Sequence, residues 1–186
     1  MPDETKALTA DHSVLRLMDG VYLGAMWLAG LAILLMSLVV PWGVFTRYAL
    51  GTGSQWPEPI AILLMMVFTF VGAACAYRAG GHIAVAMITE RLHKPLQKLL
   101  LVVVDLLMAL ASVFVVWYGT QLCIGTWHQS IAELPWLPVG ATYAALPLGG
   151  LLTLLFVLER MAFGSQAHRA VVRFDEQLVE VDHARA

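Results

Sequence analysis

One acidic residue stands inside a long apolar stretch of this chain, Asp105 in the run from Pro95 to Thr126. A carboxylate at the centre of a bilayer costs about 2.5–3.5 kcal/mol on insertion scales, so its position requires an explanation. One interpretation is a site for a coupling ion or a proton. The other is that Asp105 is within about three turns of a helix end, where it reaches the interface or pairs with a cation, including one on a partner subunit. No second carboxylate or polar cluster lies near it in the sequence, which favours the second interpretation.

Trp56 and Glu58 directly precede a shorter apolar stretch, which covers residues 59–77 and ends at Tyr77. A carboxylate in the first turn of a helix is stabilised by the positive end of the helix dipole. Glu58 therefore serves either to stabilise the helix start or to contact a partner protein at this end of the span.

Arg78 and His82 follow the same stretch and flank a Gly-Gly pair. They are either a cation reaching the interface beside a loop, or a fixed contact with another subunit. Neither pattern is typical of catalysis or substrate binding. The candidates for helix orientation or partner contact are Arg47, Trp56, Glu58, Arg78, His82 and Asp105.

Redox, metal and haem chemistry have little support. The only two cysteines, Cys75 and Cys123, lie inside apolar runs and form no Cys-x-x-Cys motif, which is typical of small buried apolar residues. Haem in a helical bundle needs histidines that project inward from facing helices, whereas all six histidines fall at ends, loops or tails. We expect no cofactor, no metal and no enzymatic activity.

The composition is that of a membrane protein. The chain has 186 residues, of which 60% are hydrophobic and 13% are charged, against roughly 25% charged residues in soluble domains. The net charge of −2 argues against a nucleic-acid partner.

Four apolar stretches are long enough to cross a bilayer. They cover residues 20–46, 59–77, 95–126 and 138–158. The sequence therefore predicts an all-α integral membrane protein with four transmembrane helices. Residues 1–19 form an N-terminal tail with a short interfacial helix at Asp11–Asp19, and residues 159–186 form a C-terminal tail.

The basic residues predict the orientation, because Lys and Arg concentrate on the cytoplasmic side. Of the 11 Lys and Arg residues, only Arg47 falls on the opposite side from both tails and the connection between spans two and three. Both termini are therefore expected in the cytoplasm. Within that connection, Ile83–Leu92 has an apolar face and polar residues, and it is either an amphipathic segment parallel to the membrane or a plain loop.

Several short motifs follow one another along the chain: Arg47-Tyr48, Trp56 with Glu58, Gly72-Ala73-Ala74, Arg78, His82-Ile83, and then Pro138, Tyr143, Pro147 and Gly149. In the order of these motifs and in length, the chain resembles the small permease (DctQ-type) subunit of tripartite ATP-independent periplasmic (TRAP) transporters. Two positions depart from the family pattern: Pro59 replaces the second Glu of the usual pair, and Ala86 replaces an acid that often follows His-Ile-x-Val.

The resemblance implies a multi-pass subunit of the bacterial cytoplasmic (inner) membrane with four spanning helices and a membrane-parallel segment. Its partners would be membrane lipid, a large multi-spanning permease subunit and a periplasmic substrate-binding protein. The system would take up an organic acid, driven by a sodium gradient, and the small subunit would enlarge the static scaffold of the carrier. The alternatives are a stand-alone four-helix exporter, although the first span lacks the usual membrane acid, and a membrane redox subunit.

Overall fold

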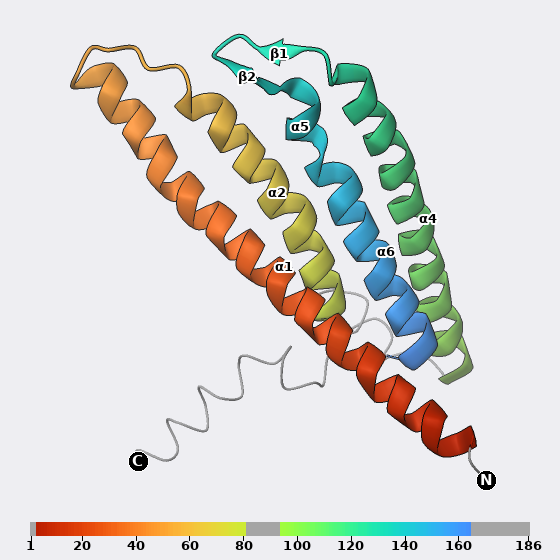
Figure 1. Cartoon of the computed structure of the whole chain (residues 1–186). Helices are drawn as coiled ribbons and strands as arrows, with labels where there is room; N and C mark the ends of the chain where they lie inside the picture. The colour runs from red at the N-terminus through yellow and green to blue at the C-terminus, as the bar shows by residue number, and fades with distance from the viewer. Residues whose placement is uncertain (1–2, 81–93, 165–186) are drawn as a thin grey trace, which may run out of the picture.

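The computed structural model describes residues 3–80 and 94–164. Four long helices lie side by side in it: α1 (Asp3–Tyr48), α2 (Pro57–Arg78), α4 (Lys94–Thr126) and α6 (Ala145–Phe163). α1 packs on α2, α2 packs on α6, and α6 packs on α4 (Figure 1). The helices therefore form a single row in the order α1–α2–α6–α4, and not a closed bundle.

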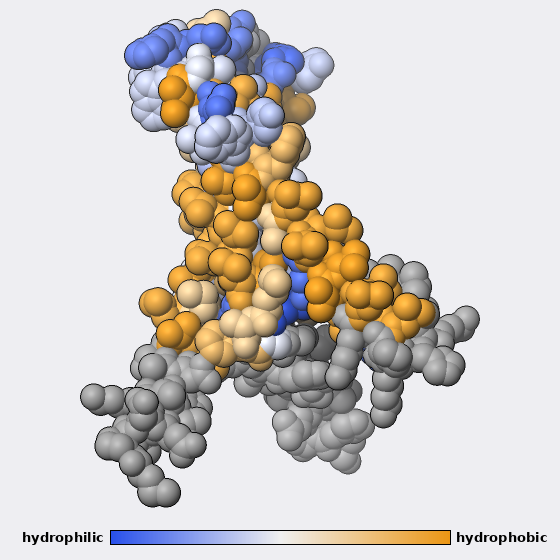
Figure 2. Space-filling view, turned by 90° about the vertical axis from the view of Figure 1, so that its right-hand side faces the viewer, coloured by the Kyte–Doolittle hydropathy of each residue, from blue (hydrophilic) through white to orange (hydrophobic). Residues whose placement is uncertain are grey.

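Four helical segments are long and apolar enough to cross a membrane, which confirms the prediction of four transmembrane helices. Figure 2 shows the hydrophobic side chains as a band beneath a polar cap. Because the helices form one row, much of this apolar surface stays exposed. Only 11% of the most hydrophobic window of the α4 segment is buried within the chain, against 33% for the segment that ends in α6.

The helix boundaries follow from local chemistry. Pro57 and Pro59 stand in the first turn of α2, where a missing backbone N–H leaves no helical hydrogen bond unmade. After the last turn, Gly80 has φ 77°, a left-handed conformation that ends helices and that glycine adopts without a steric cost. The predicted spans 59–77 and 95–126 agree closely with α2 and α4.

The ends of the other two helices differ from the prediction. α1 is continuous from Asp3 to Tyr48, so the segment Asp11–Asp19 is part of the same long helix and not a separate interfacial one. The fourth span consists of a short helix, α5 (Val139–Tyr143), followed by α6. α6 continues past residue 158 to Phe163, and in this last part Glu159 contacts α2 and Arg160 contacts α4, whereas Met161 and Phe163 are exposed.

A small hairpin connects α4 to α5 at one end of the row. Its strands are β1 (Ser130–Ile131) and β2 (Leu134–Pro138), which pair antiparallel. The sequence indicated only a loop here. Trp136 on β2 is 73% exposed, in keeping with a residue at the membrane boundary.

Two adjacent glycines let α6 approach a helix on each side. A Cβ atom on Gly149 would lie 2.5 Å from Cβ of Phe70 on α2. A Cβ atom on Gly150 would lie 2.9 Å from Cγ2 of Val116 on α4. Gly20 and Gly24, which share the more conspicuous Gly-x-x-x-Gly spacing, have no atom within 4 Å of such a Cβ in the described structure, so they do not mediate helix packing in the row.

The buried apolar core lies between α1, α2 and α6. It includes Tyr22, Ala25 and Ala29 of α1, Val71, Ala74 and Cys75 of α2, and Phe156 and Val157 of α6. The predicted amphipathic segment Ile83–Leu92, the candidate His82 and residues 165–186 lie outside the described residues.

Candidate functional site

Arg78 is buried among charged and aromatic side chains of three helices. Its Nε donates to Oε2 of Glu159 at 2.7 Å and its Nη2 donates to Oε1 of the same carboxylate at 2.7 Å. Nη2 also donates to Oδ1 of Asp19 at 2.8 Å. The side chains of Arg78 and Glu159 are only 1% and 2% exposed. This two-pronged contact is the strongest geometry available to an arginine and a carboxylate.

Two aromatic rings complete this environment. The Cζ atom of Arg78 lies 5.1 Å from the ring centroid of Tyr22 and 5.4 Å from that of Phe156, within the range of cation–π attraction. We call Asp19, Tyr22, Arg78, Phe156 and Glu159 the Arg78 cluster. It joins α1, α2 and α6 through one guanidinium group. The Nη1 atom is buried and has no hydrogen-bond partner among the described residues.

A second charged cluster joins α2, α4 and α6. The hydroxyl of Tyr77 donates to Oδ1 of Asp105 at 2.8 Å, and Nε of Arg160 lies 3.3 Å from the same oxygen. The Cζ atom of Arg160 lies 5.5 Å from the ring centroid of Tyr77. We call these three residues the Asp105 cluster. Asp105 thus pairs with a cation, as its position near a helix end suggested, and that cation belongs to its own chain.

The two clusters lie next to each other because their members are adjacent in the sequence on two helices. Tyr77 and Arg78 are consecutive on α2, and Glu159 and Arg160 are consecutive on α6. Consecutive helical residues point about 100° apart, so Arg78 and Glu159 belong to one cluster and Tyr77 and Arg160 belong to the other. Together the two clusters tie all four long helices at the end of the row where both chain termini are predicted to be cytoplasmic.

Two adjoining cavities occupy the opposite end of the row. The first, of about 460 Å³, lies between α1 and α2, and its walls include Met36, Val40, Val44 and Met65. The second, of about 450 Å³, lies between the start of α2, the hairpin and α5. Arg47, Glu58 and Ile62 line both cavities.

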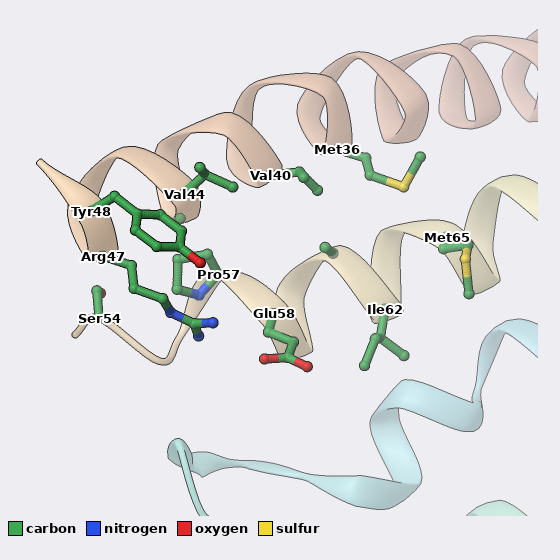
Figure 3. A pocket seen from close by; sticks show the side chains of 12 residues that line it. Met36, Val40, Val44, Arg47, Tyr48, Ser54, Pro57, Glu58, Ile62 and Met65 are labelled. Carbon is green, nitrogen blue, oxygen red and sulfur yellow. The ribbon is translucent and has the colours of Figure 1, made fainter.

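Arg47 and Glu58 point to the same side, toward the segment with the hairpin and α5 (Figure 3). Both side chains are exposed, and within the described chain neither belongs to an ion pair shorter than 4.0 Å. The second cavity also contains Glu133 and Thr142. The Thr142 hydroxyl is buried and finds no hydrogen-bond partner in the described structure. Trp56 occupies the N-cap position of α2 without a side-chain cap.

Comparison with known proteins now bears on this arrangement. Residues 36–166 match the family described as tripartite ATP-independent periplasmic transporters, DctQ component. The chain belongs to the DctQ family of TRAP transporter components. The matched region contains α2, α4, α6 and the C-terminal part of α1, and with them every residue of the Asp105 cluster.

Individual relatives agree with this DctQ assignment. The chain is 25% identical to the sialic acid TRAP transporter small permease protein of Vibrio cholerae over 76% of this chain and 84% of that protein. It is 29% identical to the ectoine TRAP transporter small permease protein of Halomonas elongata over 66% of this chain and 64% of that protein. A TRAP small permease protein of Haemophilus influenzae is 27% identical over 68% of this chain and 78% of that protein. This DctQ component is therefore a multi-pass protein of the inner membrane that functions in transport.

The structure separates the candidate residues of this DctQ component into two groups. Arg78 of α2 and Asp105 of α4 lie at one end of the row, each with partners from its own chain. Arg47, Trp56 and Glu58 lie at the other end, and their proposed roles in orientation or partner contact stay predictions. The sequence interpretation missed Asp19, Tyr77, Glu159 and Arg160 as partners. The signal was the acid–base pair Glu159-Arg160, which directly follows an apolar stretch.

Proposed function

We propose that this chain is the non-catalytic scaffold subunit of a TRAP transporter that takes up an organic acid. Uptake would depend on a periplasmic substrate-binding protein and a sodium gradient, and a large multi-spanning permease subunit would carry the substrate. The single row of four helices, with all four joined by buried charged clusters, supports this proposal most directly. The substrates in the names of two relatives, sialic acid and ectoine, differ, so the identity of the acid stays open.

The row of helices suits a static role. A carrier that moves one domain through the bilayer needs another part that stays in place against the lipid. A row exposes more apolar surface per helix than a closed bundle, and its faces are available both to lipid and to a large apolar partner. Exposed side chains on α4 illustrate this, since Leu110 is 66% exposed and Trp117 is 64% exposed.

The charged clusters would keep this row rigid. Each cluster joins three helices, and removing Arg78 would leave the Glu159 carboxylate buried without compensation. A rigid row lets the large permease subunit bind a defined surface. In this view the polar residues near the inner helix ends hold the framework together and do not bind substrate. The family membership favours this function over a stand-alone exporter or a redox subunit.

Reconstitution tests the proposal. Vesicles that contain this chain alone should show no sodium-gradient-driven uptake of any organic acid. Vesicles that also contain the large permease subunit and receive the binding protein should show uptake. Clear gradient-driven uptake by the chain alone would overturn the scaffold proposal.

A matched pair of variants connects the clusters to this role. Arg78→Ala should reduce co-purification with the large subunit and uptake in parallel, because it loosens the row. Arg16→Ala removes an exposed arginine from the same end of the protein and should leave both unchanged. Full assembly and full uptake with Arg78→Ala would show that the scaffold function does not depend on the Arg78 cluster.

A further inference from the structure

The two cavities between α1, α2 and the hairpin combine apolar walls with a charged mouth. Val40 and Val44 of α1 and Ile62 and Met65 of α2 line the first cavity, and Arg47 and Glu58 line it where α1 ends and α2 begins (Figure 3). Its volume of about 460 Å³ falls within the roughly 300–1,000 Å³ of small-molecule sites.

The depth of the first cavity matches one leaflet of a bilayer. α1 descends about 16 Å between Arg47 and Met36, at ~1.5 Å rise per residue. Half of a hydrocarbon core is about 15 Å. With Arg47 at the level of the lipid headgroups, the α1 residues that line the cavity would reach about the middle of the membrane. A single acyl chain of the leaflet at the Trp56 end would cover these walls along their whole length.

The second cavity holds the chemistry for a headgroup. It presents one cation, Arg47, and two carboxylates, Glu58 and Glu133. A guanidinium group binds phosphate through paired N–H donors, and carboxylates accept hydrogen bonds from a primary ammonium group. The buried Thr142 hydroxyl, which has no partner in the described structure, adds a hydrogen-bonding group to the same cavity.

We propose that this pair of cavities binds one phospholipid whose headgroup carries both a phosphate and a primary ammonium group. The phosphate would lie at Arg47, the ammonium at Glu58 and Glu133, and one acyl chain between α1 and α2. This inference goes beyond the transport function and does not depend on it. An anionic lipid fits less well, since the cavity carries two carboxylates against one arginine. A water-soluble solute would leave the apolar wall between Met36 and Val44 without contacts.

Native mass spectrometry of the full chain in detergent micelles tests the proposal. The added probes are phosphatidylethanolamine, phosphatidylcholine, phosphatidylglycerol and soluble glycerophosphoethanolamine. One equivalent of phosphatidylethanolamine should bind, about tenfold more tightly than either other lipid, because only its headgroup offers N–H donors to the carboxylates. The soluble headgroup should not bind measurably, since it lacks the acyl chain.

Two pairs of variants locate the site. Arg47→Ala should weaken phosphatidylethanolamine binding about tenfold, whereas Arg16→Ala removes an arginine at the opposite end of α1 and should have no effect. Val40→Trp should fill the first cavity and abolish binding. Leu38→Trp introduces the same side chain on an open face of α1, where the residue is 63% exposed, and should leave binding unchanged. Size-exclusion chromatography and circular dichroism serve as controls for the folding of each variant.

Three outcomes would overturn the proposal. Equal binding of all three lipids would show that only the general lipid shell is observed. Unchanged binding in Arg47→Ala and Val40→Trp would place the lipid elsewhere. Binding of glycerophosphoethanolamine as tight as that of the lipid would identify a site for a soluble solute.

Discussion

The same kinds of charged residue surround the two ends of α2 and are used differently. At the end predicted to face the cytoplasm, called the inner end, Arg78 and Glu159 are almost fully buried and joined by two hydrogen bonds of 2.7 Å. At the outer end, Arg47 and Glu58 are exposed and line cavities. The inner charges pair with each other, whereas the outer charges remain available to a ligand or a partner.

Desolvation accounts for the difference. A charge removed from water loses hydration free energy of several kcal/mol, which only close opposite charges and hydrogen bonds can offset. The Arg78 cluster supplies both, and the rings of Tyr22 and Phe156 add cation–π attraction. Exposed charges keep their water, so Arg47 and Glu58 have no need for a mutual contact. Removing members from each end should therefore have very different consequences.

Arg78→Ala should produce the largest effect. It leaves the Glu159 carboxylate buried without its cation, and breaking a buried pair in this way costs about 3–5 kcal/mol. The free energy of unfolding, measured by denaturant titration in mixed micelles, should fall by that amount. The free energy of unfolding of Arg78→Lys should lie between those of Arg78→Ala and the original chain, because lysine keeps the charge and loses the paired contact.

Arg16→Ala is the matched control, since Arg16 is an exposed arginine of α1. Its stability should stay within about 0.5 kcal/mol of the original chain. If Arg78→Ala were equally mild, the Arg78 cluster would not be what holds the inner end together.

Gly149→Ala should produce the next largest effect. The new methyl group would lie 2.5 Å from Cβ of Phe70 and 2.7 Å from its backbone carbonyl carbon, so α2 and α6 must separate. Overpacking of this kind costs about 1–3 kcal/mol, measured by the same titration. Gly24→Ala adds the same group where no described atom lies within 4 Å, and it should be neutral or slightly stabilising. Equal effects of the two substitutions would contradict the close approach of α6 to α2.

Tyr77→Phe should have a smaller effect at the inner end. It removes the hydroxyl that donates to Asp105 at 2.8 Å but keeps the ring beneath Arg160. A hydrogen bond to a charged group contributes about 1.5–3 kcal/mol, and the remaining contact with Arg160 should hold the loss near the lower figure. Tyr118→Phe removes an exposed hydroxyl from α4 and serves as the control. Equal stability of Tyr77→Phe and the original chain would show that Asp105 does not depend on this hydroxyl.

The four spans could be predicted from sequence because membrane crossing is a local property. An apolar run of sufficient length predicts a helix with no knowledge of its neighbours, which is why α2 and α4 agree closely with the prediction. The hairpin escaped the prediction, since β1 has only two residues and its pairing depends on β2 and the helix ends that hold both.

The charged clusters could be predicted only in part. Asp105 and Arg78 stood out because charges are rare in apolar surroundings. Their partners did not, because Arg78 meets residues that are 59 and 81 positions away in the sequence. Asp19 and Glu159 were assigned to the edges of tails, where an acidic residue attracts no notice. Only the order of helices in the row shows that these edges come together.

The smallest effect on stability is expected from Arg47→Ala and Glu58→Gln at the outer end. Each should change the free energy of unfolding by less than about 0.5 kcal/mol, as substitutions of exposed residues usually do. The double variant should equal the sum of the single ones within about 0.3–0.5 kcal/mol, because independent sites are additive. Arg78→Ala with Glu159→Gln provides the contrast, since residues in direct contact should show a coupling energy well above that. A coupling as large between Arg47 and Glu58 would mean that they pair with each other in the membrane, and the outer cavities would then have no free cation with which to bind the phosphate of a headgroup.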